Sequence, residues 1–120
     1  MEPYKLGEME QRFAEIIWGC TPVSSGELVK RCEAELGWKK STTYTMLKRL
    51  CQRGIFINEN GVVSALMTKE DFSAAQGKQF LNDAFGGSLP RFIAAFTRRN
   101  QLSDQEIREL QQLIEEYREE

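Results

Sequence analysis

The chain has 120 residues, of which 41% are hydrophobic and 28% charged, with 16 Lys and Arg against 18 Asp and Glu. This composition predicts a soluble globular protein of one or two small domains and excludes a disordered chain. The chain has no histidine and its three cysteines form no CxxC pair, so Ser-His-Asp and Cys-His catalysis and imidazole metal ligands are excluded. We therefore expect no enzyme activity, no metal site and no cofactor. The apolar runs are short and the N-terminus has no targeting pattern, so we expect a cytoplasmic protein without membrane contact.

Two helical patterns fill the first third of the chain. Apolar residues from Leu6 to Trp18 recur at spacings of three and four, which predicts a first helix. Ser24 and Glu27 have the spacing of a capping box, so a second helix is expected to begin there and to end at Gly37.

A third helix is predicted over residues 41–53, and its two faces differ in character. Thr43, Met46, Leu47 and Leu50 form a stripe that is expected to be buried, and the hydroxyl-bearing start of the helix is expected to cap it. The segment 38–53 contains five basic residues and no acidic one, although the whole chain has a formal net charge of -2. Such a face is typical of nucleic-acid binding. The residues expected to contact DNA are Lys39, Lys40, Ser41, Thr42, Thr45, Lys48 and Arg49.

A β-hairpin is predicted after the third helix, because Asn60-Gly61 joins two β-rich runs, 55–58 and 62–67. Three short helices followed by a hairpin describe a winged helix. The predicted fold is thus mostly α with a small β-hairpin (α+β), with a winged helix-turn-helix DNA-binding domain over residues 1–70. The alternative is a generic α+β domain in which the basic helix is only a solvated face.

Residues 71–120 are predicted to form a helical dimerisation domain. Thr68 and Ser103 have helix-start spacing with Asp71 and Glu106, and a Gly-Gly-Ser-Leu-Pro stretch opens another helix between them. Five of the seven Phe lie in this half, which is too short to bury them well alone, so a homodimer is favoured over packing within one chain. The expected dimer contacts are Phe85, Leu89, Phe92, Ile93, Phe96, Ile107, Leu110 and Ile114.

Several stretches carry a family resemblance. In the first half they are Leu6-Gly7-Glu8-Met9-Glu10, Ile17-Trp18, the tract from Trp38 to Leu50, and Arg53-Gly54; in the second half they are the stretches from Phe85 to Pro90 and from Leu102 to Ile107. Over nearly its whole length the sequence resembles the penicillinase-repressor family (the BlaI/MecI/CopY type) of bacterial winged-helix transcriptional repressors.

The resemblance implies a homodimer that represses transcription by binding an inverted-repeat operator in double-stranded DNA. Helix 41–53 would lie in the major groove, and the tract from Lys40 to Arg49 would be the recognition helix. In β-lactam-responsive members, proteolysis inactivates the repressor at a bond that aligns here with Ala95-Phe96, which would make a sensor protease a further partner. We hypothesise that a cut there abolishes dimerisation and releases DNA, because it splits the apolar stripe from Leu89 to Phe96.

Departures from the family pattern narrow these expectations. The hairpin turn contains Glu59 and no basic residue, so contacts from the hairpin to phosphate are not expected. No cysteine follows Cys51, so copper sensing through a C-terminal cysteine cluster is not expected either. The alternative function is a winged-helix protein-protein assembly module without DNA binding, in which the basic stripe meets an acidic partner.

Overall fold

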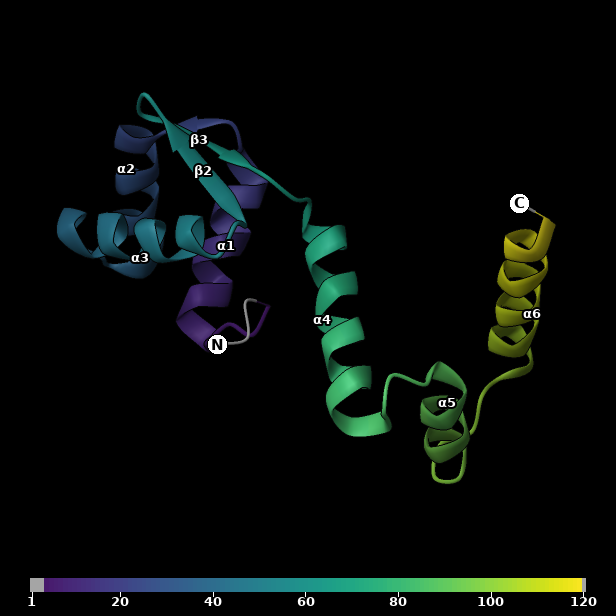
Figure 1. Ribbon diagram of the computed structural model, residues 1–120. Coiled ribbons are helices and arrows are strands. Elements are labelled where there is room, and N and C mark those ends of the chain that lie inside the picture. Colours follow the sequence, from purple (N-terminus) through teal and green to yellow (C-terminus); the bar gives the residue numbers. More distant parts are fainter. Residues whose placement is uncertain (1–3, 120) are drawn as a thin grey trace. The chain divides into compact units, whose positions relative to one another are not determined.

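The computed structural model describes residues 4–119, and Figure 1 shows its helices and strands along the chain. In chain order these are α1 (Glu8–Cys20), β1 (Val23–Ser24), α2 (Ser25–Leu36), α3 (Lys40–Gln52), β2 (Phe56–Glu59), β3 (Val62–Ala65), α4 (Lys69–Phe85), α5 (Leu89–Thr97) and α6 (Asp104–Glu119). The contacts group the chain into two units, Met1–Gln79 and Phe80–Glu120, which we call the head and the C-terminal unit. The predicted α+β fold, a winged helix followed by further helices, is confirmed. The division into domains 1–70 and 71–120 stays a prediction.

Local capping signals set several of the helix starts. The backbone N–H of Glu27 donates to Ser24 Oγ at 3.1 Å, and Gly37 ends α2 with a φ of 68°, which glycine adopts without strain. At α6 the capping box is complete, since Ser103 Oγ accepts from the N–H of Glu106 and the Glu106 carboxylate accepts from the N–H of Ser103, both at 3.1 Å. These predicted starts are confirmed.

The predicted cap of the third helix is wrong. The helix begins one residue earlier, at Lys40, and its N-cap is Lys39, whose side chain forms no capping hydrogen bond in the described structure. The hydroxyls of Thr43 and Thr45 instead donate backwards to the carbonyls of Lys39 (3.4 Å) and Ser41 (2.9 Å). A hydroxyl inside the first turns meets the carbonyl four residues earlier and not a free N–H, so it cannot cap.

The predicted hairpin is confirmed and belongs to a three-stranded antiparallel sheet of order β1-β3-β2. Asn60 and Gly61 connect β2 to β3 with φ values of 53° and 80°. Two left-handed residues are what the tight hairpin turn needs, because their twist matches that of the flanking strands. The additional strand, β1, has two residues and pairs with β3 through Val23 and Val63.

Apolar side chains from α1, α2, α3, the sheet and the start of α4 form the core of the head. Its largest fully buried members are Phe13, Phe56, Phe72, Ile17, Leu28, Leu50, Ile55 and Val63. The Trp18 ring lies 5.3 Å from the Phe56 ring and 5.4 Å from the Phe72 ring, and its Nε1 donates to the carbonyl of Met67 at 3.1 Å. Burying a side chain such as Phe72 stabilises the fold by about 2 kcal/mol, so the first turn of α4 is held firmly in the head.

The C-terminal unit keeps its apolar side chains much more exposed than the head does. The Phe85 and Phe92 rings lie 5.4 Å apart, and Phe80 and Phe96 each contact Phe92 at 5.8 Å. Among the described residues of α5 and α6, however, none is buried. The rings therefore form a partial cluster rather than a closed core.

Candidate nucleic-acid interface

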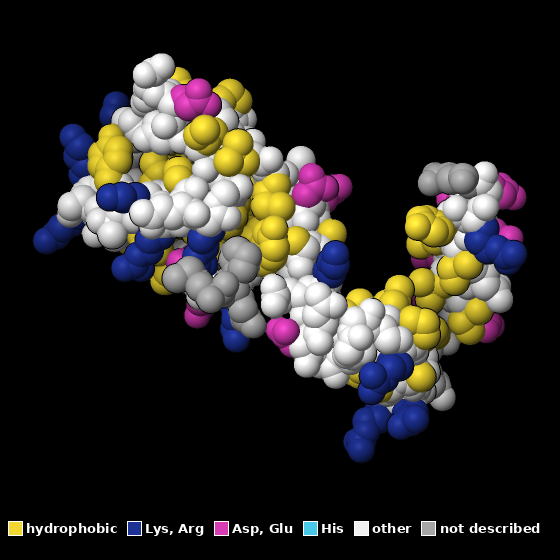
Figure 2. Space-filling model, in the orientation of Figure 1, with side chains coloured by type: hydrophobic (Ala, Val, Ile, Leu, Met, Phe, Trp, Pro, Cys, Tyr) yellow, Lys and Arg dark blue, Asp and Glu magenta, His cyan; other side chains and the backbone are white. Residues whose placement is uncertain are grey.

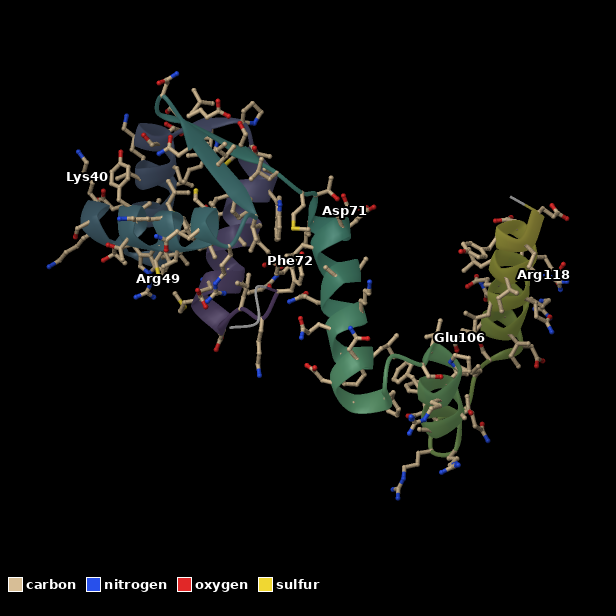
Figure 3. The ribbon with its side chains drawn as sticks, in the orientation of Figure 1. Lys40, Arg49, Asp71, Phe72, Glu106 and Arg118 are labelled. Carbon is tan, nitrogen blue, oxygen red and sulfur yellow. The ribbon has the colours of Figure 1, made fainter. Side chains whose placement is uncertain are left out.

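The outward face of α3 presents all the residues that sequence reasoning assigned to DNA. Lys39, Lys40, Ser41, Thr42, Thr45, Lys48 and Arg49 are exposed, whereas Thr43, Leu47 and Leu50 on the opposite face are buried in the head. Figure 3 shows Lys40 and Arg49 projecting away from the helix, and Figure 2 shows Lys and Arg side chains along this edge of the head. Packing thus orients the helix so that its polar face meets solvent.

Short hydroxyl side chains lie between the cations on this face. Ser41, Thr42 and Thr45 line one shallow hollow together with Met46. The Thr45 hydroxyl donates its hydrogen to the backbone carbonyl of Ser41 within the helix. The hydroxyl oxygen can therefore still accept a hydrogen bond, and the methyl group can make an apolar contact. Side chains this short allow a helix to approach base edges closely, while lysine and arginine reach outward to phosphates.

Two residues that sequence reasoning missed join α3 to neighbouring elements at the edge of this face. The Tyr44 hydroxyl donates to Ser25 Oγ at 3.2 Å, and the N–H of Ser25 donates to the carbonyl of Gly61 at 2.8 Å. The start of α2, the middle of α3 and the hairpin turn are thereby linked through one serine. Periodicity within a helix cannot reveal such a contact, because its partners are 19 and 36 residues apart along the chain.

The fifth basic residue of the stripe, Arg53, has a different role from the other four. Its Nη2 lies 3.5 Å from Glu10 Oε2, its Nη1 donates to the carbonyl of Lys5 at 3.0 Å, and its side chain is 18% exposed. A guanidinium that is paired and half-buried in this way offers no free charge to a phosphate. Arg53 therefore ties α3 to the N-terminal segment and to α1.

The hairpin turn lacks positive charge. Asn58, Glu59 and Asn60 are exposed, and the sequence has no basic residue from Gly54 to Thr68. The positive charge of the interface is therefore confined to α3 and the residue before it.

The three cysteines are free thiols inside or beside the core of the head. Burial raises the pKa of Cys32 to about 11, although a hydrogen bond with Thr43 lowers it in part. Burial also raises the pKa values of Cys20 and Cys51 above the usual value. Since the thiolate is the nucleophile and the metal ligand, these thiols are poorly reactive at neutral pH.

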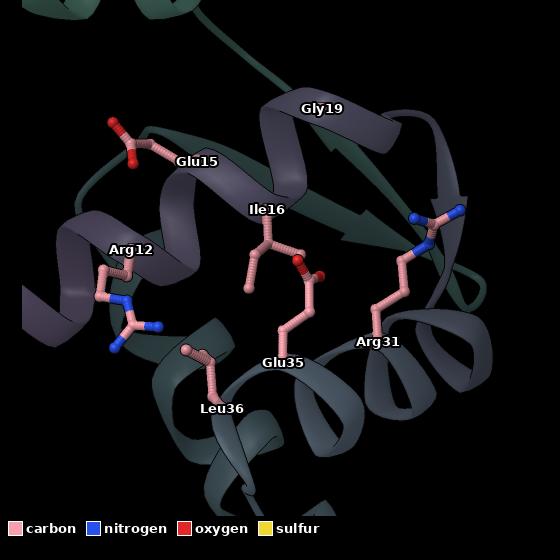
Figure 4. Close-up of a pocket in the computed structure, with 7 residues that line it drawn as sticks. All are labelled: Arg12, Glu15, Ile16, Gly19, Arg31, Glu35 and Leu36. Atoms are coloured by element: carbon pink, nitrogen blue, oxygen red, sulfur yellow. The ribbon is translucent and has the colours of Figure 1, made fainter.

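A shallow pocket between α1 and α2 is lined by side chains that include Arg12, Glu15, Arg31 and Glu35 (Figure 4). Its two positive and two negative side chains balance, so the pocket has no net charge with which to select an ion. It contains none of the residues predicted for DNA binding or dimerisation. Within residues 4–119, no helix is both long enough and apolar enough to cross a membrane.

The residues predicted for dimerisation divide between three helices. Phe85, at the end of α4, and Phe92 and Phe96, on α5, belong to the ring cluster, and Ile93 is half-buried beside them. The others remain open to solvent, with exposed fractions of 55% for Leu89, 39% for Ile107, 38% for Leu110 and 58% for Ile114. The predicted cleavage bond, Ala95-Phe96, lies inside α5.

Comparisons with known proteins give one consistent result. The sequence profile described as penicillinase repressor matches residues 6–116. The penicillinase repressor of Bacillus licheniformis is 26% identical over 118 residues, covering 95% of this chain and 92% of that protein. The methicillin resistance regulatory protein MecI of Staphylococcus aureus is 25% identical over 116 residues (92% and 94%), and a penicillinase repressor of Staphylococcus aureus is 28% identical over 103 residues (82% of each). The matches extend from α1 into α6, and the chain belongs to the penicillinase repressor family, a family of transcriptional repressors.

Proposed function

We propose that this protein is a homodimeric repressor that binds an inverted-repeat DNA operator, with α3 of each protomer in the major groove. The observation that carries the proposal is the exposed face of α3 and its N-cap Lys39, which combines four exposed cations with three short hydroxyl side chains and has no acidic residue. The family membership and the resemblance of the tract from Lys40 to Arg49 to the recognition helix support the same assignment.

The chemistry of this face accounts for both affinity and specificity. Lys39, Lys40, Lys48 and Arg49 would neutralise phosphates and release counterions, which gives an affinity that falls steeply with salt. The hydroxyl groups would bond base edges or phosphate oxygens, and the threonine methyl groups would touch thymine methyls. Because the chain has a net charge of -2, non-specific attraction to DNA is weak, so selectivity comes from two half-sites bound together.

Dimerisation is proposed through the apolar faces of α5 and α6. Leu113, Ile114 and Tyr117 on α6 are 58% to 80% exposed, and Phe96 on α5 is 40% exposed. Figure 2 shows apolar side chains on the surface of the C-terminal unit. Monomeric proteins rarely leave such a contiguous apolar surface uncovered, and a second copy would bury it.

Release of the operator is proposed to follow proteolysis near Ala95-Phe96 by a sensor protease. Both residues lie within α5, so a protease would have to unwind this helix locally before cutting. The nine residues of α5 are short for a helix, and its neighbouring segment 98–103 is not helical. A cut there would divide the ring cluster, leaving Phe96 with α6, and would divide the proposed dimer surface.

The test of DNA binding is selection from randomised duplex DNA at near-physiological salt, followed by titration of the enriched sequence. We expect an inverted repeat with half-sites about one helical turn apart or closer. The double variant Lys48→Ala, Arg49→Ala should weaken binding to all sequences. Each lost phosphate contact lowers the log-log salt slope by ~0.9, so a dimer that loses four should show a decrease of roughly 3 to 4.

The matched control is Lys78→Ala with Arg99→Ala, which removes the same charge from exposed positions outside α3. This control should retain the affinity and salt slope of the wild-type protein, and both double variants should sediment as dimers. A folded dimer that enriches no sequence would contradict the proposal and favour the protein-protein assembly module. Dissociation of the Lys48, Arg49 variant into monomers would show that α3 is structural.

A further inference from the structure

The N-terminal segment Tyr4–Leu6 lies between the end of α3 and the first half of α4. Two successive backbone carbonyls of this segment accept hydrogen bonds from the two helices. The carbonyl of Lys5 accepts from Arg53 Nη1, and the carbonyl of Tyr4 accepts from Gln76 Nε2, both at 3.0 Å. The segment thus connects the recognition helix to α4 through residues 48 and 72 positions away in the sequence.

Side-chain packing holds the segment in place. The Tyr4 ring meets the Phe72 ring edge-on at 5.9 Å, and Tyr4 and Leu6 both pack against the core of the head. Arg53 is further held by its ion pair with Glu10, in which both side chains are less than 20% exposed. The hydrogen bond from Gln76 to the Tyr4 carbonyl is partly buried, which strengthens it, whereas the bond from Arg53 to the Lys5 carbonyl is exposed and relies on the Glu10 ion pair to hold the guanidinium in place.

The hydrogen bond of Gln76 can prevent α4 from pivoting on the head. Phe72 anchors α4 in the core near the start of the helix, and a helix anchored at one side chain can pivot about it. The exposed Lys69–Glu15 ion pair, at 3.3 Å, lies before Phe72 at the start of the helix. Gln76 lies one turn beyond Phe72, about 6 Å along the helix axis, and supplies an attachment on the far side of the pivot. Together these contacts fix the part of α4 that belongs to the head, which ends at Gln79.

We propose that Tyr4, Gln76 and Arg53 are positioning residues that fix α4 relative to α3 and so determine the half-site spacing that the dimer accepts. This inference depends on the proposed function, because spacing has a meaning only for a dimer on an inverted repeat. From Phe72 to the end of α4 is 13 residues, about 20 Å of helix. A tilt of about 15° about Phe72 moves the far end by about 5 Å, which exceeds the 3.4 Å rise of one base pair.

The test compares operators whose half-sites are moved one or two base pairs apart or together. Gln76→Met removes the donor and keeps the length and neutrality of the side chain. Gln79→Met makes the same change three residues further along α4 and is the matched control. We expect Gln76→Met to lower the discrimination between the best spacing and its neighbours by about fivefold, the effect of one lost hydrogen bond, with the affinity for an isolated half-site unchanged.

Two further variants make the outcome decisive. Gln76→Lys restores a donor to the Tyr4 carbonyl and should restore the narrow spacing preference, whereas Tyr4→Ala removes the ring contact and should broaden it like Gln76→Met. The inference is overturned if Gln76→Met and Tyr4→Ala, both folded by their melting curves, keep the wild-type spacing profile. If the wild-type protein itself binds no inverted repeat, the proposed function fails instead, so the two failures are distinguishable.

Discussion

The buried thiol of Cys32 should make the stability of the head depend on pH. Its side chain is fully buried on α2, and burial raises its pKa from 9.0 to about 11. In the unfolded chain the thiol loses its proton first, near its ordinary pKa. The free energy of unfolding should therefore fall as the pH rises from about 9 towards 11, and the contribution of Cys32 is complete below this range.

We expect this loss to be about 1 kcal/mol per pH unit, measured by urea denaturation at several pH values between 8 and 11. Cys32→Ala should be less stable at pH 8 by about 1 to 2 kcal/mol, because it leaves a small cavity, and should show a shallower decrease with pH. The two proteins differ only at this side chain, so the difference between the two curves isolates the thiol. Parallel curves would contradict the prediction.

At the scale of elements, the hairpin has no basic residue, so its place relative to DNA in the proposed complex needs a test of its own. Glu59 lies at the end of β2 and is exposed, so it would repel any nearby phosphate. If the hairpin lies against the DNA backbone in the complex, Glu59→Lys should strengthen operator binding. It should also steepen the log-log salt slope by about 1 for each protomer.

The control for the hairpin is Glu70→Lys, which makes the same charge change at an exposed position in the first turn of α4. Fluorescence anisotropy with a labelled operator across a series of salt concentrations measures both quantities. Equal affinities and slopes for Glu59→Lys and Glu70→Lys would place the hairpin away from the backbone.

The elements also show which structural features a sequence makes predictable. The caps at Ser24 and Ser103 and the turn at Asn60-Gly61 follow from residues a few positions apart, so local pattern was sufficient. The exposed face of α3 followed from helical periodicity for the same reason. Strand β1 and the Tyr44–Ser25 hydrogen bond depend on contacts between distant residues, which no local pattern contains.

The predicted cap of α3 was wrong for a different physical reason. A hydroxyl-rich sequence is compatible both with an N-cap and with the first turns of a helix, because the side chains can bond either a free N–H or the carbonyl four residues earlier. The structure takes the second option at Thr43 and Thr45. The basic residue Arg53 likewise fits a DNA-binding stripe by its charge alone, and only its contacts with Glu10 and Lys5 remove it from that face.

At the scale of the whole molecule, the core is unequally shared between the two units. The large side chains that are fully buried come from residues up to Phe72, whereas the described residues of α5 and α6 include none that is buried. The head therefore has a closed core of its own, while the proposed dimer would supply most of the apolar burial of α5 and α6. This unequal burial predicts that cutting the chain within the C-terminal unit prevents dimerisation and leaves the fold of the head intact.

A chain divided between Ala95 and Phe96 tests this division and the proposed mode of release together. We expect residues 1–95, mixed with a peptide of residues 96–120, to retain a cooperative melting transition, because the buried core of the head is complete. The mixture should sediment as monomers, since the cut separates Leu89 and Phe92 from Phe96 and from α6.

Its affinity for the full operator should fall by about 100-fold or more, which is the avidity lost when two linked half-site contacts become independent. Its affinity for a single half-site should match that of the intact chain, which separates lost dimerisation from a damaged α3. If the divided chain binds the full operator as tightly as the intact protein, cutting this bond cannot be the means of release.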